Sequence, residues 1–457
     1  MLSFNSSDNT HSSVVKFEQM LKTDQVFYFD SEEFENIIVH YLNIGKKQLA
    51  QKALKMGLEQ HPECVDLLLL KSEMLIIDSK FELAENVLKY IESLAADVEE
   101  ILLQRSTIAS KTGKHEKAIA FLNEALKITE DPLEIWDLLG TEYLLVGNYE
   151  QAQYYFKCCV EEDTEDHTSL YNLLFCYEQL EQTQNAIAIL NDILEKNPYS
   201  EVAWHQMGNF LINQGRYDEA LSAFDFALIS DDTFVSAYIE KGRLLEQKKQ
   251  FNEALSNYET ALGMTDDSAY LLGRMGSCHL ILGNEKWAID FFLKAVHKDP
   301  ASEYGWLALI DYYIDKKEFT KAKHYVYKAL KLNSDTIDLW MQSATIHRHF
   351  ELFDEVQLAY QQMILLGDLQ RDTWISLIEI LIKLHEWEQA LQIAKEFESI
   401  FPDDEEALCL MAGCYLRMGK MQKAKKSFEW AVRNTEPKAS FLALFPEFEK
   451  HVTKLKL

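Results

Sequence analysis

Large apolar side chains recur along the chain at a fixed spacing of 34 residues. Counted in 34-residue segments from Ser31, they hold the fourth position of twelve consecutive segments: Phe34, Leu68, Leu102, Trp136, Leu170, Trp204, Tyr238, Leu272, Trp306, Trp340, Trp374 and Leu408. The twentieth position is alanine in all but one of these segments: Ala50, Ala84, Ala118, Ala152, Ala186, Ala220, Ala254, Ala288, Ala322, Val356, Ala390 and Ala424. Two closely crossing helices need one small side chain at the contact and large ones beside it. The pattern therefore predicts one pair of packed helices in each segment.

Helix-breaking residues fall at the junctions that this spacing predicts. Glycine holds the fifteenth position of six segments, where a turn with positive φ would end the first helix: Gly45, Gly113, Gly147, Gly215, Gly283 and Gly419. Proline holds the thirty-second position of four segments: Pro62, Pro198, Pro300 and Pro402. Because proline stops a preceding helix or opens the next one, each segment is predicted to contain a helix, a turn and a second helix.

The segment 133–166 carries the fullest version of the pattern. It contains Trp136-x2-Leu139-Gly140-x2-Tyr143 and then Ala152-x3-Phe156, which resembles the signature of the tetratricopeptide repeat family. The resemblance implies an all-α, right-handed superhelical solenoid of about twelve helix-turn-helix repeats over residues 31–438, with the first helices lining the concave face. The repeats are expected to start at residues 31, 65, 99, 133, 167, 201, 235, 269, 303, 337, 371 and 405.

The two ends of the chain do not follow the repeat. Residues 1–30 are expected to form a tail and a short capping segment, with residues 1–12 disordered and a helix over Val14 to Leu21. Residues 439–457 are expected to form a C-terminal capping helix and tail. Phe441, Leu444, Phe445 and Phe448 have helical spacing there. A terminal solenoid repeat needs such a cover, although a docking or dimerisation segment is the alternative interpretation.

Charge and sorting signals restrict the class of function. The chain carries 45 basic and 74 acidic residues, a formal net charge of −29. Such a field repels phosphate backbones, so binding to nucleic acid is disfavoured. The sequence contains no signal-peptide pattern and no transmembrane segment. Seven cysteines without disulfide-like density fit a reducing compartment, so the expected location is cytoplasmic.

The sequence shows no constellation of residues that indicates catalysis. It lacks a glycine-rich phosphate loop and the common hydrolase motifs, so the chain is predicted not to be an enzyme and to need no cofactor. His347 and His349 are two residues apart and diverge on a helix, so no metal site is expected. Cys176, Cys278 and Cys414 share the tenth position of their segments, which is typical of buried structural thiols.

The inner-face positions of the fifth to eighth segments hold residues suited to a protein or peptide partner. In the tetratricopeptide repeat family, ligands usually contact positions 2, 5, 6, 9, 12 and 13 of the first helix. Here those positions include Tyr171, Asn172, Phe175, His205, Asn209, Asn213, Arg243 and Arg274. Asparagine can bond an extended backbone, and arginine can hold a carboxylate with two parallel hydrogen bonds. The family's carboxylate clamp for chaperone C-termini is not reproduced, so that mode is disfavoured.

These observations favour a non-enzymatic scaffold or adaptor that binds a partner along the concave surface. A peptide-responsive regulatory sensor is the first alternative, and an RNA-binding helical-repeat protein is a less favoured one. The lysine-rich second helices of the ninth and twelfth segments are solvated faces or patches for an acidic partner. The sequence identifies neither the partner nor the oligomeric state.

Overall fold

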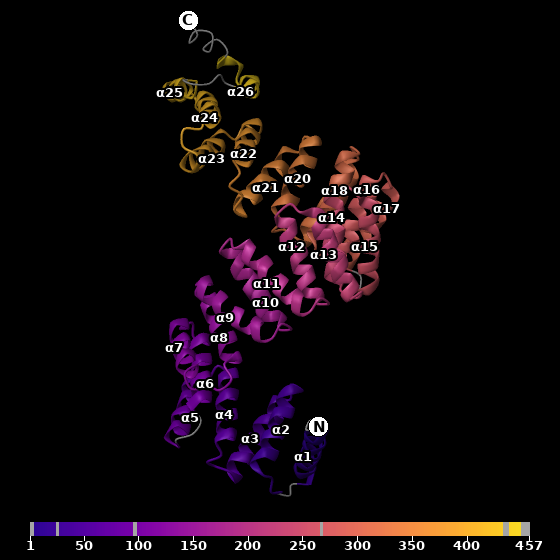
Figure 1. The fold of residues 1–457 in the computed structure, drawn as a ribbon. Coiled ribbons are helices and arrows are strands. Elements are labelled where there is room, and N and C mark those ends of the chain that lie inside the picture. The colour runs from indigo at the N-terminus through magenta and orange to yellow at the C-terminus, as the bar shows by residue number, and fades with distance from the viewer. Residues whose placement is uncertain (1–3, 24–26, 95–97, 266–267, 433–437, 449–457) are drawn as a thin grey trace. The chain divides into compact units, whose positions relative to one another are not determined.

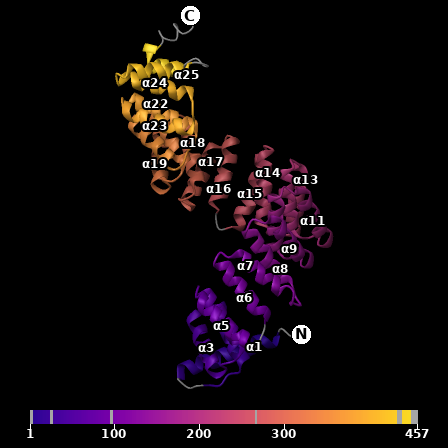
Figure 2. The same cartoon turned by 90° about the vertical axis from the view of Figure 1, so that its left-hand side faces the viewer.

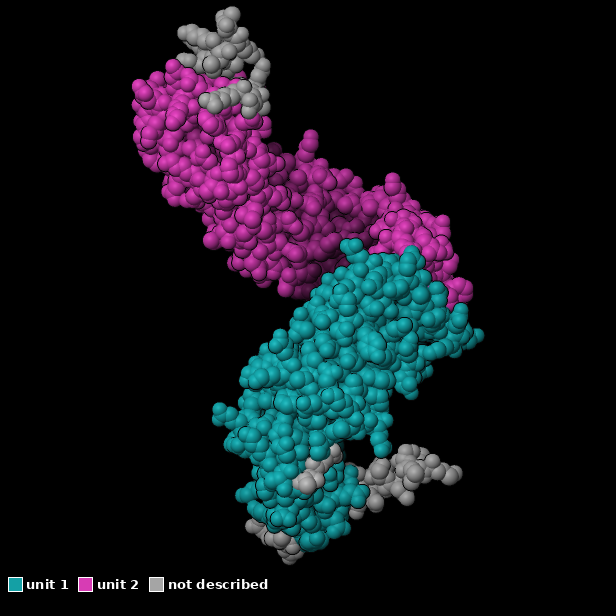
Figure 3. Space-filling view, turned by 60° about the vertical axis from the view of Figure 1, so that its left-hand side comes forward, with its two compact units in different colours: residues 1–203 teal, residues 204–457 magenta. Residues whose placement is uncertain are grey.

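The computed structural model describes residues 4–23, 27–94, 98–265, 268–432 and 438–448, and within these ranges the chain forms helices and no strands. It divides into two compact units, residues 1–203 and residues 204–457 (Figure 3). The boundary between the two units falls within α12 (Glu201–Asn213). The predicted C-terminal tail, residues 449–457, lies outside the described residues.

The first unit contains α1 and five helix pairs. Its helices are α1 (Phe4–Thr23), α2 (Ser31–Asn43), α3 (Lys47–Gln60), α4 (Val65–Ile77), α5 (Phe81–Ser93), α6 (Val98–Lys111), α7 (His115–Ala125), α8 (Leu133–Leu145), α9 (Tyr149–Glu162), α10 (His167–Gln179) and α11 (Thr183–Lys196). Successive pairs lie side by side in chain order, as the contacts of α2 with α4 and of α4 with α6 show (Figure 1).

The second unit continues the same arrangement. Its helices are α12 (Glu201–Asn213), α13 (Tyr217–Ser230), α14 (Val235–Gln247), α15 (Phe251–Met264), α16 (Ala269–Ile281), α17 (Glu285–Lys298), α18 (Glu303–Asp315), α19 (Phe319–Leu332), α20 (Ile337–His349), α21 (Phe353–Leu365), α22 (Arg371–Lys383), α23 (Trp387–Ile400), α24 (Glu405–Arg417), α25 (Met421–Ala431), α26 (Ala439–Leu444) and the 3-10 helix η1 (Pro446–Phe448) (Figure 2). The predicted all-α solenoid of helix-turn-helix pairs is therefore confirmed.

The turn inside each pair has the backbone geometry that the glycine pattern predicted. The residue at position 15 has positive φ in all twelve pairs. Glycine occupies six of these turns, and the other six place a side chain in the left-handed region: Ser79, Glu181, Lys249, Lys317, Glu351 and His385. After α8, for example, Gly147 donates to the carbonyl of Leu144 at 3.0 Å and Asn148 donates to that of Tyr143 at 2.9 Å. These bonds satisfy the last carbonyls of the first helix.

Small residues lie where the two helices of a pair cross. Ala152 is fully buried. Gly140 lies under the ring of Phe156, where an added Cβ would be 2.7 Å from Cε1. Equivalent contacts join Gly208 to Phe224 and Gly276 to Phe292. The recurrent alanine and glycine positions are thus packing positions, which leaves other helix faces for function.

The ends of the chain differ in part from the prediction. Helix α1 begins at Phe4, so the helix expected over Val14 to Leu21 is part of a longer one. At the other end, α26 stops at Leu444 and Pro446 opens η1. Phe441, Phe445 and Phe448 are buried against the last pair, so the capping interpretation of this segment is confirmed.

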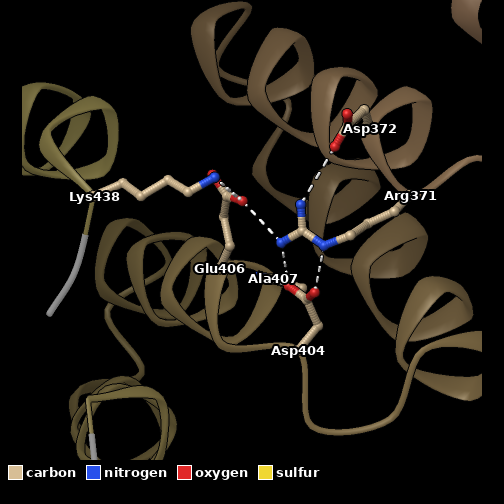
Figure 4. Close-up of polar contacts among 6 residues, drawn as sticks. All are labelled: Arg371, Asp372, Asp404, Glu406, Ala407 and Lys438. Atoms are coloured by element: carbon tan, nitrogen blue, oxygen red, sulfur yellow. Dashed lines mark hydrogen bonds and ion pairs between the residues drawn. The ribbon is translucent and has the colours of Figure 1, made fainter. Parts of the chain in front are cut away.

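A network of charged residues ties this cap to the last two pairs (Figure 4). Arg371 at the start of α22 donates from Nε and Nη2 to the two oxygens of Asp404, at 2.7 and 3.1 Å. Its Nη2 also donates to Glu406 at 2.9 Å, and Lys438 before α26 donates to the same carboxylate at 2.7 Å. Asp404 caps α24 by accepting from the Ala407 amide at 3.0 Å. The network fixes the spacing of α22, α24 and α26.

Candidate partner-binding surface

Three of the predicted surface residues lie together on α10 of the first unit. Tyr171 and Phe175 are both exposed and one helical turn apart, with Asn172 half-buried beside them. Phe175 also packs edge-on against Tyr149, with ring centroids 6.1 Å apart. This contact limits the rotamers of Phe175, so α10 presents an ordered apolar surface with an amide at its edge.

The predicted residues on α12 are not all accessible. His205 is only 7% exposed, and its ring packs against Phe224 and Phe234. The inclusion of His205 as a ligand-contacting residue was therefore wrong. Apolar residues hold the same fifth position in several other pairs, including Leu69, Ile239 and Ile375, and that pattern could have indicated burial. Asn209 is half-buried and Asn213 is exposed, so both amides stay accessible.

Burial sets the charge state of His205. Desolvation lowers the pKa of its imidazole to about 4. Its Nε2 is buried and has no hydrogen-bond partner among the described residues. The side chain is therefore neutral at physiological pH and contributes to packing in the second unit.

Arg243 on α14 lies on the surface with a glutamate of its own helix. Its Nη1 donates to both oxygens of Glu240, at 2.9 and 3.0 Å, and its side chain is 51% exposed. The Glu240 charge is the main reason that the pKa of the guanidinium is raised. Nε and Nη2 of Arg243 make no hydrogen bond to another described residue, so both nitrogens can donate hydrogen bonds to a ligand.

Arg274 on α16 is half-buried and forms a two-bond ion pair with Glu246. Its Nε and Nη2 donate to the two oxygens of Glu246 on α14, at 3.1 and 2.6 Å. The Tyr258 hydroxyl donates to the same carboxylate at 2.7 Å. Burial alone would lower the pKa of Arg274, but the Glu246 carboxylate together with Tyr258 and Tyr304 more than offsets this effect, and the pKa is raised. The expectation that Arg274 offers two free parallel bonds is therefore corrected, because Glu246 already accepts them.

Two tyrosines that the sequence interpretation missed complete this surface. Tyr270 at the start of α16 is 42% exposed, and its hydroxyl interacts electrostatically with both arginines. Tyr304 on α18 lies over Gly273, where a Cβ would be 2.5 Å from its ring, and its hydroxyl is 3.0 Å from Ser277 Oγ. Both tyrosines hold the second position of their segments, which is itself one of the inner-face positions of the family.

These side chains form one continuous patch on the second unit. We call Arg243, Tyr270, Arg274 and Tyr304 the arginine–tyrosine surface. It crosses the first helices α14, α16 and α18, which lie in order along the unit. The patch combines one exposed guanidinium with aromatic side chains that bury area at low entropic cost. It can donate hydrogen bonds to a carboxylate or a backbone carbonyl and cover an apolar side chain.

Other candidate chemistry is absent from the part of the chain that the structure describes. No three His, Cys, Asp or Glu side chains converge there in an arrangement that could hold a metal ion. All seven cysteines are free, and burial raises the pKa of Cys176 to about 11 and that of Cys414 to about 12. Such thiols are protonated at neutral pH, which favours a structural role. None of the described helices has the length and apolar character needed to cross a membrane.

Comparison with family models identifies the repeat. Three models, each described as a tetratricopeptide repeat, match residues 179–238, residues 99–132 with 405–435, and residues 239–303. The matches fall in both compact units.

Three relatives of known name are similar over long stretches. The BBSome complex member BBS4 of Bos taurus is 22% identical over 73% of this chain. A TPR repeat-containing protein of Methanocaldococcus jannaschii is 23% identical over 50% of the chain, and the anaphase-promoting complex subunit 3 of Schizosaccharomyces pombe is 20% identical over 64%. The matched segments span 64%, 43% and 38% of these relatives, which is less than two thirds of each.

A search of solved structures returns similar helical arrays. The crystal structure of the APC/C hetero-tetramer Cut9–Hcn1 is 14% identical, with a TM-score of 0.37. The alignment covers 90% of this chain and 94% of that one.

Proposed function

The chain is a tetratricopeptide repeat protein, and on that premise we propose that it is a non-enzymatic scaffold or adaptor. It binds a segment of a partner protein on the arginine–tyrosine surface of its second unit. The observation that carries this proposal is the state of Arg243, which is exposed, fixed by Glu240 and left with two unused donors.

The contacts within the surface suggest how a partner segment is held. Arg243 can donate from Nε and Nη2 to one carboxylate or to backbone carbonyls without losing its bonds to Glu240. Tyr270 beside it can cover an apolar side chain. Arg274 stays with Glu246 and positions the helices rather than the ligand. Binding therefore needs little rearrangement of the free protein, which lowers its entropic cost.

The names of the relatives support a role in assemblies. The bovine relative is named as a member of a complex, and the fission yeast relative is named as a subunit of one. We propose that this chain is likewise a component that holds other proteins together. Seven free thiols, five of them buried, support the proposal that it works in the reducing cytoplasm.

Affinity purification tests this function. Tagged full-length protein is expressed in the source organism as wild type, as Arg243→Ala with Tyr270→Ala, and as Arg216→Ala. Arg216 is the matched control, because it is exposed in the same unit and paired with Glu219 three residues away. Quantitative mass spectrometry should show a stoichiometric partner with wild type and Arg216→Ala and its loss with the double variant. Equal recovery with all three proteins would show that the partner does not bind this surface.

A further inference from the structure

A cavity of about 350 Å³ opens between α3 and α4 in the first unit. Its floor is apolar, because Leu54 and Met74 are buried there. Lysine side chains stand around it, among them Lys71 from α4. Its volume is at the lower end of the range of about 300–1,000 Å³ for ligand sites, so it fits one or two side chains.

The charges around the cavity do not balance. Asp78 at its edge is already paired with Lys47 and with Lys80, whose Nζ is 3.1 Å from Oδ2. Glu59 is 4.0 Å from the ammonium of Lys55. Lys71 has no carboxylate partner among the described residues, although its side chain is half-buried. Among the described residues that line the cavity, Lys71 is thus a charged side chain without an ion-pair partner.

Equivalent positions elsewhere in the chain show what Lys71 lacks. Arg105 lies 34 residues after Lys71, and Lys241 lies 170 residues after it. Both hold the same repeat position as Lys71. Arg105 Nη2 binds Glu85 at 3.2 Å and Glu92 at 2.8 Å. Both carboxylates belong to α5, the second helix of the preceding pair.

The same holds for Lys241, which binds Asp225 of the preceding α13 at 2.5 Å. On α3, the residues equivalent to Glu85, Glu92 and Asp225 are Gln51, Leu58 and Lys55. All three line the cavity, and none can supply a negative charge. The cavity thus occurs where two other pairs of the chain place an ion pair.

We infer that this cavity binds a partner-protein segment that presents a carboxylate next to a large apolar side chain. The apolar side chain fills the space over Leu54 and Met74, and the carboxylate takes the place that Glu92 has beside Arg105. The inference rests on the proposed role in binding proteins and adds a second site, in the first unit, with its own chemistry. Its size suits one anchor of a larger interface rather than a free metabolite.

Selection from a random dodecapeptide display library on the full-length protein tests this. Peptides that bind the wild type are next exposed to the Gln51→Glu variant, and those that also bind the variant are discarded. The substitution places on α3 the carboxylate that α5 supplies to Arg105. The surviving peptides should contain Asp or Glu within four residues of Leu, Ile, Met or Phe. Their Kd should rise about tenfold with Lys71→Met, as expected for the loss of a part-buried ion pair, and should be unchanged with Lys52→Met, an exposed lysine outside the cavity.

The outcomes separate this site from the arginine–tyrosine surface. Peptides lost with Lys71→Met but retained by Arg243→Ala support the cavity, even if the surface of the second unit binds nothing. Peptides lost only with Arg243→Ala would overturn the cavity and leave the proposed function in place. The cavity is also overturned if no peptide survives depletion on Gln51→Glu, or if the survivors lack an acidic residue.

Discussion

Replacing Gly242 by alanine should disturb both the packing of the seventh pair and the arginine–tyrosine surface. A Cβ on Gly242 would be 2.5 Å from Cε1 and 2.9 Å from Cδ1 and Cζ of the Tyr258 ring. The ring is fully buried. It must move away from α14, and its hydroxyl then leaves Glu246, the carboxylate that also holds Arg274.

The expected magnitude follows from three terms. Overpacking a core costs about 1–3 kcal/mol. Loss of the hydrogen bond to a charged group costs about 1.5–3 kcal/mol. The better helix propensity of alanine returns about 1 kcal/mol. The local free energy of unfolding should therefore fall by about 3 kcal/mol, within a range of about 1.5–5 kcal/mol.

Native-state hydrogen exchange measured by mass spectrometry suits this prediction, because a repeat array opens locally rather than in one step. Peptides from α14, α15 and α16 should exchange faster in Gly242→Ala, while those from α22 to α24 should not change. Gly263→Ala on α15 is the matched control, since no atom lies within 4 Å of the added Cβ. It should be neutral or slightly stabilising. If Gly242→Ala also leaves exchange unchanged, the small-residue packing argument is refuted.

Three further predictions test other parts of the structure. The pKa of His205 is about 4 in the folded protein and about 6.5 in the unfolded chain, so the unfolded chain binds the proton more readily. Lowering the pH from about 7 to about 5 should therefore reduce the free energy of unfolding of its region by about 2 kcal/mol. Urea titrations of wild type and His205→Gln should diverge in this pH window. Lys317 has a φ of 59°, so Lys317→Gly should raise the free energy of unfolding by about 0.5–1 kcal/mol, seen as a higher urea midpoint. Gly283→Ala at the equivalent turn should lower it. Arg371→Ala removes the cation that Asp404 and Glu406 share. Because Arg371 is partly exposed, the local free energy of unfolding should fall by only about 2 kcal/mol, seen as faster hydrogen exchange in α22 and α24. Unchanged exchange would mean that the network does not contribute to stability.

The repeat spacing predicts most of the fold because it reports backbone packing. Alanine at position 20 and glycine at position 15 indicate where helices touch and where the chain turns, and these are properties of single positions. The start of α1 at Phe4 does not follow from the sequence pattern, because residues 5–12 are polar and show no apolar periodicity.

The candidate surface was harder to predict because it depends on pairs of side chains. The spacing places Arg274 on an inner face, but it does not show that Glu246, 28 residues earlier, reaches it. It also does not show that Gly273 lets Tyr304 lie on the backbone of α16. Of the predicted residues, Tyr171, Asn172 and Phe175 share one face of α10, while their role in binding stays a prediction.

The proposed function requires that the second unit binds a partner on the arginine–tyrosine surface. The most direct measurement is hydrogen–deuterium exchange of the full-length protein with and without the co-purified partner. Protection should concentrate in α14 and α16, residues 235–247 and 269–281, and should be absent when Arg243 and Tyr270 are both alanine. Protection confined to the second helices of the pairs, or to the first unit alone, would contradict the claim.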